Sequence, residues 1–147
     1  MKTSTFQIQL NTDAFERSAS GSIVGPVWVT LGDAQYPELG WSDFPVVVLG
    51  WWLDELASLS HRSESAVFRF MDGPFQFTAQ RDGETAQLLR ITAETSGSAE
   101  AVVVGVPLGT LNVAIEAAGR VVAAECRRRG WSSRDVEGLA SRLGPLH

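Results

Sequence analysis

The chain has 147 residues and a formal net charge of −5 at pH 7; 44% of its residues are hydrophobic and 20% are charged. This size and balance predict one globular domain over residues 1–147, able to bury a core without a disulfide or a metal. The acidic charge argues against nucleic acid as a partner, because phosphate-binding surfaces carry basic stripes, and it suits a basic protein partner.

The expected location follows from the absence of targeting signals in the sequence. The first ten residues contain no apolar stretch of signal length, and no run approaches the ~18 apolar residues that a membrane span needs. We therefore expect a cytoplasmic protein with no membrane partner. Cys126 is the single cysteine, which excludes an internal disulfide.

Two strands are expected near the N-terminus. Residues 5–10 alternate apolar and polar side chains with a period of two, as a half-buried strand does. Residues 23–31 alternate in the same way, and Pro26 places the first half of that strand at a sheet edge or a bulge. Residues 32–40, with two glycines and a proline, predict a loop.

The segment Trp41–Leu59 holds three of the five tryptophans and predicts a mostly buried helix over residues 43–59. Ser42 or Asp43 can cap this helix, and Pro45 fits its first turn, where a missing N–H costs nothing. The helix is apolar on several sides, so it either packs on more than one side or meets a partner. The apolar residues near 3.6 spacing are Phe44, Val48, Trp51 or Trp52, Leu56 and Leu59.

Four further strands are expected to form an antiparallel meander. Residues 71–74, 81–84 and 95–98 contain the turn signals between them, and the Asp-Gly pair at Asp82 indicates a tight hairpin because it tolerates positive φ. The strands are predicted at residues 66–71, 74–80, 86–93 and 99–105.

Helical spacing returns after Pro107, where an apolar stripe predicts a long helix that ends at Arg129 with Gly130 as its C-cap. Ser132 or Ser133 can cap a short terminal helix. The fold class is therefore α+β, with the order β-β-α-β-β-β-β-α-α. We expect an antiparallel sheet of about six strands with the helices packed on one face.

The sequence offers few residues for familiar catalysis. His61 lies in a polar loop and His147 is the last residue, so neither has the partners of a nucleophilic triad or a zinc site. Cys126 lies on the apolar stripe, where burial makes a thiol inert. The basic cluster Arg127-Arg128-Arg129 is interpreted as a helix C-terminus that offsets the negative end of the dipole. We predict no catalytic residue, no metal ligand and no cofactor.

The candidate binding residues are aromatic and acidic. Trp51 and Trp52 diverge by about 100° around the helix, so if one enters the core the other lies at its margin. Tryptophan is enriched among interface anchors, although all five could instead be structural, as staples over helix ends or fillers between sheet and helices. The full candidate set is Trp41, Asp43, Trp51, Trp52, Asp54, Glu55 and Asp72.

Three short motifs carry a resemblance to known proteins. They are Trp41-Ser42-Asp43-Phe44-Pro45, Trp51-Trp52-Leu53 and Phe70-Met71-Asp72-Gly73-Pro74-Phe75. The pattern resembles small uncharacterised bacterial domains, some of which are grouped with the immunity proteins of polymorphic toxin systems. The resemblance implies a binding protein that masks the active surface of a toxin, and it carries over no catalytic residue.

These observations favour a non-catalytic cytoplasmic module that acts by protein–protein contact, as an immunity protein or a self-associating domain. In this hypothesis the helix 43–59 supplies the contact surface, with Trp51 or Trp52 beside Asp54 and Glu55. The alternative is a small-molecule-binding protein or enzyme. Its pocket would be lined by Trp28, Trp41 and the meander phenylalanines, with Asp43 or Asp72 as the polar group.

Overall fold

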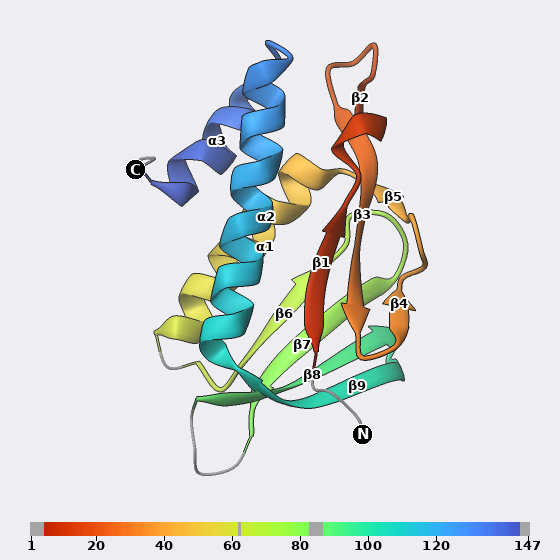
Figure 1. Cartoon of the computed structure of the whole chain (residues 1–147), viewed down its shortest axis with the longest axis vertical. Helices are drawn as coiled ribbons and strands as arrows, with labels where there is room; N and C mark the ends of the chain where they lie inside the picture. The colour runs from red at the N-terminus through yellow and green to blue at the C-terminus, as the bar shows by residue number, and fades with distance from the viewer. Residues whose placement is uncertain (1–4, 62, 83–86, 145–147) are drawn as a thin grey trace.

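The computed structural model describes residues 5–61, 63–82 and 87–144, which form three α-helices and two antiparallel sheets (Figure 1). The α+β class and the predicted order of the long elements are confirmed. In Figure 1 the helices gather on one side of the molecule and the two sheets lie on the other.

The first sheet is built around one long strand, β3 (Ile23–Leu31). It pairs along its second half with β1 (Phe6–Leu10), and its buried and partly exposed residues alternate strictly, as the sequence predicted. Three short strands complete the sheet, and all three pair with β3. They are β2 (Glu16–Arg17), β4 (Ala34–Tyr36) and β5 (Ser42–Asp43).

The second sheet is the predicted meander, in the order β6 (Ser65–Arg69), β7 (Phe75–Arg81), β8 (Leu88–Thr95) and β9 (Ser98–Pro107). The β8–β9 hairpin turns at Ser96 and Gly97, whose φ angles of 51° and 85° are those of a two-residue turn with positive φ. The tight turn predicted at 81–84 falls partly on residues 83–86, which lie outside the described residues.

The prediction of one sheet with about six strands is wrong in its arrangement, because the six long strands divide between two sheets. The predicted loop 32–40 also contains β4. Pro26 stands inside β3 opposite Ser42, where β3 changes partners, and β5 is the one described strand that pairs with it. Pairing with β1 starts one residue later, at Val27, so the missing N–H of Pro26 interrupts neither ladder.

Three helices complete the fold: α1 (Pro45–Ser60), α2 (Leu108–Arg128) and α3 (Arg134–Leu143). The predicted Pro45 is the first residue of α1, but Phe44 is its N-cap, so neither Ser42 nor Asp43 caps it. Both belong to β5 instead. The predicted N-cap of α3 is confirmed, because Ser133 accepts a hydrogen bond from the N–H of Val136 at 3.2 Å. The C-cap of α2 is Arg129 instead of the predicted Gly130, which is the next residue and has a φ of 70°.

The core lies where α1 and α2 meet the sheets. Trp52 is completely buried, and its ring meets Phe70 and Phe77 edge-on at 5.3 and 5.1 Å. Phe77 of the second sheet in turn packs against Phe6 of the first, at 5.3 Å between ring centroids. Aromatic contacts therefore join the two sheets and α1 into one hydrophobic cluster.

A glycine makes room for one aromatic ring at the edge of this core. Phe15 is buried, and a Cβ placed on Gly25 of β3 would lie only 2.3 Å from its Cδ1 atom. No side chain fits at that distance unless the ring moves.

Candidate functional site

Asp43 is a buried carboxylate whose side chain accepts four N–H groups. It is 2% exposed. The donors are the backbone N–H groups of Phe44 (2.7 Å), Met71 (3.2 Å) and Asp72 (3.1 Å) and the indole Nε1 of Trp41 (2.9 Å). Four donors occupy about as many acceptor positions as a carboxylate has. Asp43 therefore fastens the β6–β7 turn to the start of α1 and has no position left for a ligand.

The structure brings Trp41, Asp43 and Asp72 together, but as parts of this anchor. Trp41 is partly buried and meets Phe75 edge-on at 5.0 Å. Asp72 contributes its backbone N–H, and its residue is exposed. Of the rings considered for the pocket of the alternative function, Phe68, Phe70 and Phe77 pack on one another and on Trp52.

The two adjacent tryptophans of α1 lie in opposite environments. Trp52 donates its indole N–H to the carbonyl of Arg69 at 2.8 Å from inside the core, so it is not available to a partner. Trp51 is 40% exposed. The expected divergence of the pair is confirmed, and the structure shows that Trp51 is the one at the surface.

Asp54 and Glu55 also point to different elements. Asp54 forms a two-pronged ion pair with Arg142 of α3, at 2.8 and 3.1 Å. Glu55 accepts the backbone N–H of Val67 at 3.1 Å and so holds α1 to β6. The two carboxylates therefore do not form a shared acidic surface.

Trp51 lies at a groove of about 260 Å³ between α1 and α3, here named the Trp51 groove. A Cβ on Gly50 would lie 3.9 Å from Nη1 of Arg142, an ordinary contact distance, so the approach of α3 does not require a glycine there. The same arginine donates to Asp54 and to the carbonyl of Gly138, which fixes one end of the groove. The lining residues are Val46, Val47, Gly50, Trp51, Arg134, Asp135, Gly138, Leu139 and Arg142.

The terminal helix supplies the second wall of this groove, and sequence reasoning did not include it in the site. Its apolar face was readable from the sequence, and Leu139 is indeed buried. The pairing of Arg142 with Asp54 joins residues 88 positions apart, so no local signal could have placed α3 beside Trp51.

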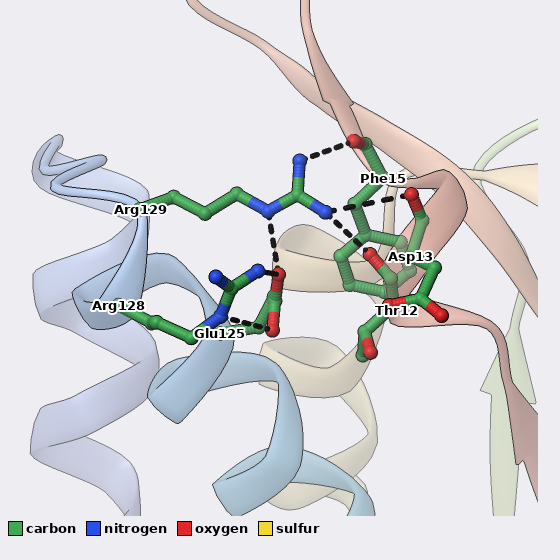
Figure 2. A network of polar contacts seen from close by, with 6 residues as sticks. All are labelled: Thr12, Asp13, Phe15, Glu125, Arg128 and Arg129. Atoms are coloured by element: carbon green, nitrogen blue, oxygen red, sulfur yellow. Dashed lines mark hydrogen bonds and ion pairs between the residues drawn. The ribbon is translucent and has the colours of Figure 1, made fainter.

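The basic cluster at the end of α2 is largely engaged within the protein (Figure 2). Arg128 and Arg129 both pair with Glu125, each at 2.5 Å. Arg129 also donates to the carbonyl oxygens of Phe15 (2.9 Å) and Thr12 (2.8 Å), so it fastens α2 to the segment between β1 and β2. The predicted place of this cluster at a helix C-terminus is confirmed, because Arg127 and Arg128 lie in the last turn of α2 and Arg129 is its C-cap.

Two titratable groups near this terminus are shifted by their surroundings. The guanidinium groups of Arg128 and Arg129 lower the pKa of Glu125 to about 2. Burial raises the pKa of the Cys126 thiol, which is fully enclosed. A thiol with a raised pKa is a poor nucleophile, as expected for a core cysteine.

In residues 5–61, 63–82 and 87–144, no three His, Cys, Asp or Glu side chains gather as metal ligands. Over the same described ranges, none of the helices combines the length and apolarity that crossing a membrane requires. Comparison with protein-family models, curated proteins and solved structures finds no significant match.

Proposed function

We propose that this chain is a non-catalytic protein-binding module whose contact surface is the Trp51 groove. The carrying observation is the half-exposed indole of Trp51 at a groove between two helices. Tryptophan combines a large apolar area with few rotatable bonds, and it dominates binding energy at many interfaces. Trp52 is the tryptophan of this pair that fills the core, whereas much of the Trp51 side chain is exposed to solvent.

The surroundings of Trp51 match the anatomy of a protein interface. Val46, Val47 and Leu139 supply apolar walls, and Arg134 and Asp135 provide a charged rim. Interfaces commonly combine an apolar centre with a polar margin. The occupant that fits is a protein segment with an apolar side chain for the face of Trp51 and a carboxylate for Arg134.

The more specific form of this proposal is an immunity protein, as the three tryptophan- and phenylalanine-containing motifs imply. In that case the groove would receive a segment of a toxin and hold it against the acidic body of this chain. The net charge of −5 supports a toxin that is basic outside the contacting segment.

The proposal is tested with the product of the neighbouring gene as first partner. Both proteins are purified, and their dissociation constant is measured by calorimetry for the wild type and for Trp51→Ala. We expect Trp51→Ala to weaken binding by about 30-fold or more, since truncating an interface tryptophan typically removes about 2 kcal/mol or more. Val104→Ala, an exposed apolar residue on β9, is the matched control and should bind like the wild type.

Equal affinity of Trp51→Ala and wild type would remove the groove from the interface. Turnover of a small molecule by the purified chain alone, or its stabilisation by a metabolite, would replace this proposal with the alternative of a ligand-binding protein or enzyme. Circular dichroism of each variant shows whether the fold is intact.

A further inference from the structure

We propose that a second copy of this chain adds to the outer edge of β1, so that two molecules share one continuous first sheet. The surface involved is separate from the Trp51 groove and does not depend on the function proposed for it. It consists of the free edge of β1 and the side of α2 that faces it, which lie next to each other in Figure 1.

The backbone of β1 has an unpaired edge. Gly32 donates to the carbonyl of Thr5 and Asn11 donates to that of Pro26, which fixes the odd-numbered residues as those bonded to β3. In an antiparallel ladder the residues between them point their N–H and C=O groups away. Phe6, Ile8 and Leu10 therefore present these groups at the outer edge, and no hydrogen bond joins them to another described residue.

This edge lacks the protection that edge strands usually carry. The sequence Phe6-Gln7-Ile8-Gln9-Leu10 contains no charge and no proline, and its pairing with β3 is regular over all five residues. A groove of about 550 Å³, here named the β1 groove, runs along the whole strand. Its other wall consists of small or short side chains of α2, namely Ala114, Ala117, Ala118 and Val121.

The order of residues in β1 fits a second copy of itself. An antiparallel pair centred on Ile8 places Ile8 opposite Ile8, Phe6 opposite Leu10 and Gln7 opposite Gln9 of the other copy. The first two pairs are the ones whose backbone groups point outward, so each can exchange two hydrogen bonds across a twofold axis. The glutamines would meet side by side, where their amides can extend the bond that Gln9 already donates to Gln7 at 3.1 Å.

Charge also favours a second copy over a charged partner. None of the residues lining the β1 groove is charged, although the chain carries −5 overall. The charged residues in the middle of α2 lie elsewhere: Arg120 donates to the carbonyl of Leu143, and Glu116 lines a hollow beside α1. Two like-charged molecules can therefore meet at this surface without bringing charges together. The exposed Val121 of α2 adds apolar area beside the strand.

The first test measures mass in solution by sedimentation equilibrium at micromolar concentrations. The wild type should be a dimer. Val121→Lys puts a charge at the β1 groove on a residue that is 48% exposed, so the fold should survive. This variant should weaken dimerisation by about tenfold or more, because like charges are brought together across the axis. Val104→Lys makes the same change at a residue 44% exposed on β9 and should remain dimeric.

The second test reads the register. Ile8→Cys places two thiols opposite each other across the axis, at the backbone separation of about 5.5 Å that a disulfide can span. Mild oxidation with diamide should therefore link Ile8→Cys into a covalent dimer. Leu10→Cys, which would face Phe6 of the other copy, should link much more slowly.

Three results would overturn the proposal. The first is a wild type that remains monomeric in the sedimentation experiment. The second is a dimer unaffected by Val121→Lys and not linked through Ile8→Cys. The third is a dimer that Trp51→Ala dissociates while Val121→Lys does not, which would place self-association at the Trp51 groove. Loss of partner binding by Trp51→Ala from an intact dimer would separate the two surfaces.

Discussion

Asp43 joins three parts of the chain through one carboxylate. Its oxygens accept the indole of Trp41, the N–H that precedes α1 and two N–H groups of the β6–β7 turn. A buried carboxylate is tolerated when hydrogen bonds replace its hydration, and two of the four donors here come from the backbone of the β6–β7 turn. These hydrogen bonds hold a turn that is distant in the sequence against β5 and the start of α1.

Asp43→Asn tests this role. The amide keeps one acceptor oxygen and replaces the other with an NH₂ group, which faces two N–H donors instead of accepting them. We expect a loss of about 2–4 kcal/mol in the free energy of unfolding, measured with urea. Asp72→Asn alters an exposed carboxylate in the same turn and should change it by less than about 0.5 kcal/mol. Equal effects of the two variants would contradict the anchor.

The environment of a single residue could be predicted from the sequence only where the spacing of apolar residues indicated which side of an element it lies on. The divergence of Trp51 and Trp52 was predictable from helix geometry, but α1 is apolar on several sides, so the sequence could not say which tryptophan faces outward. Asp43 was named as a binding residue or cap, because an acidic residue before a helix is typical of both. Two of its four donors, Met71 and Asp72, lie 28 and 29 positions away, and no local pattern indicates them.

At the level of elements, the C-terminus of α2 is fastened by charge and backbone geometry together. Gly130 donates to the carbonyl of Arg127 and Trp131 to that of Cys126, which closes the helix end with both bonds of a Schellman motif. The guanidinium of Arg129 lies 4.7 Å from the ring centroid of Trp131. The same side chain reaches Thr12 and Phe15, so the helix end and the N-terminal sheet are held together.

The Glu125 ion pairs predict a dependence of stability on pH. The folded pKa of about 2 lies below the ordinary value of 4.5, so this carboxylate stabilises the fold above about pH 4.5 and loses its contribution as the pH falls toward 2. We expect Glu125→Gln to be less stable than the wild type at pH 6 and to approach it near pH 2, by urea denaturation.

Glu116→Gln, on the same helix but without an ion pair in the described part of the chain, is the control and should follow the wild type at both values. A stability deficit of Glu125→Gln that is the same at pH 6 and near pH 2 would show that the ion pairs are not its cause.

At the level of the whole molecule, Tyr36 connects the two sheets. It ends β4 of the first sheet, and its hydroxyl accepts the N–H of Gln76 at 3.1 Å and donates to the carbonyl of Glu94 in the second. Its ring meets Phe70 and Phe75 edge-on. Burial raises the pKa of Tyr36, so the phenol stays protonated and able to donate at neutral pH.

Tyr36→Phe removes this connection while keeping the ring. We expect a loss of about 1–2 kcal/mol in the free energy of unfolding, because the N–H of Gln76 loses its acceptor in a partly buried place. Hydrogen exchange should accelerate at Gln76 and leave the β8–β9 hairpin turn unchanged. Uniform acceleration across both sheets would instead indicate global destabilisation.

The division into two sheets is the part of the fold that could not be predicted from the sequence. The long strands and the helices show their periods, and their order was predicted correctly. Strands β2 and β5 have two residues each and β4 has three, too few to show any alternation. The partners of β3 and the contact of α3 with α1 depend on long-range pairing, so neither the sheet boundary nor the Trp51 groove could be derived from local patterns.

The close approach of Gly25 to Phe15 limits which substitutions the two positions can accept during evolution. A Cβ added at Gly25 would lie 2.3 Å from Cδ1 of Phe15. A larger residue at position 25 therefore becomes acceptable only after a smaller residue has replaced the phenylalanine at position 15. The two sites should therefore change as a pair, and a large aromatic opposite a glycine at this spacing is a mark by which distant descendants of the fold can be recognised.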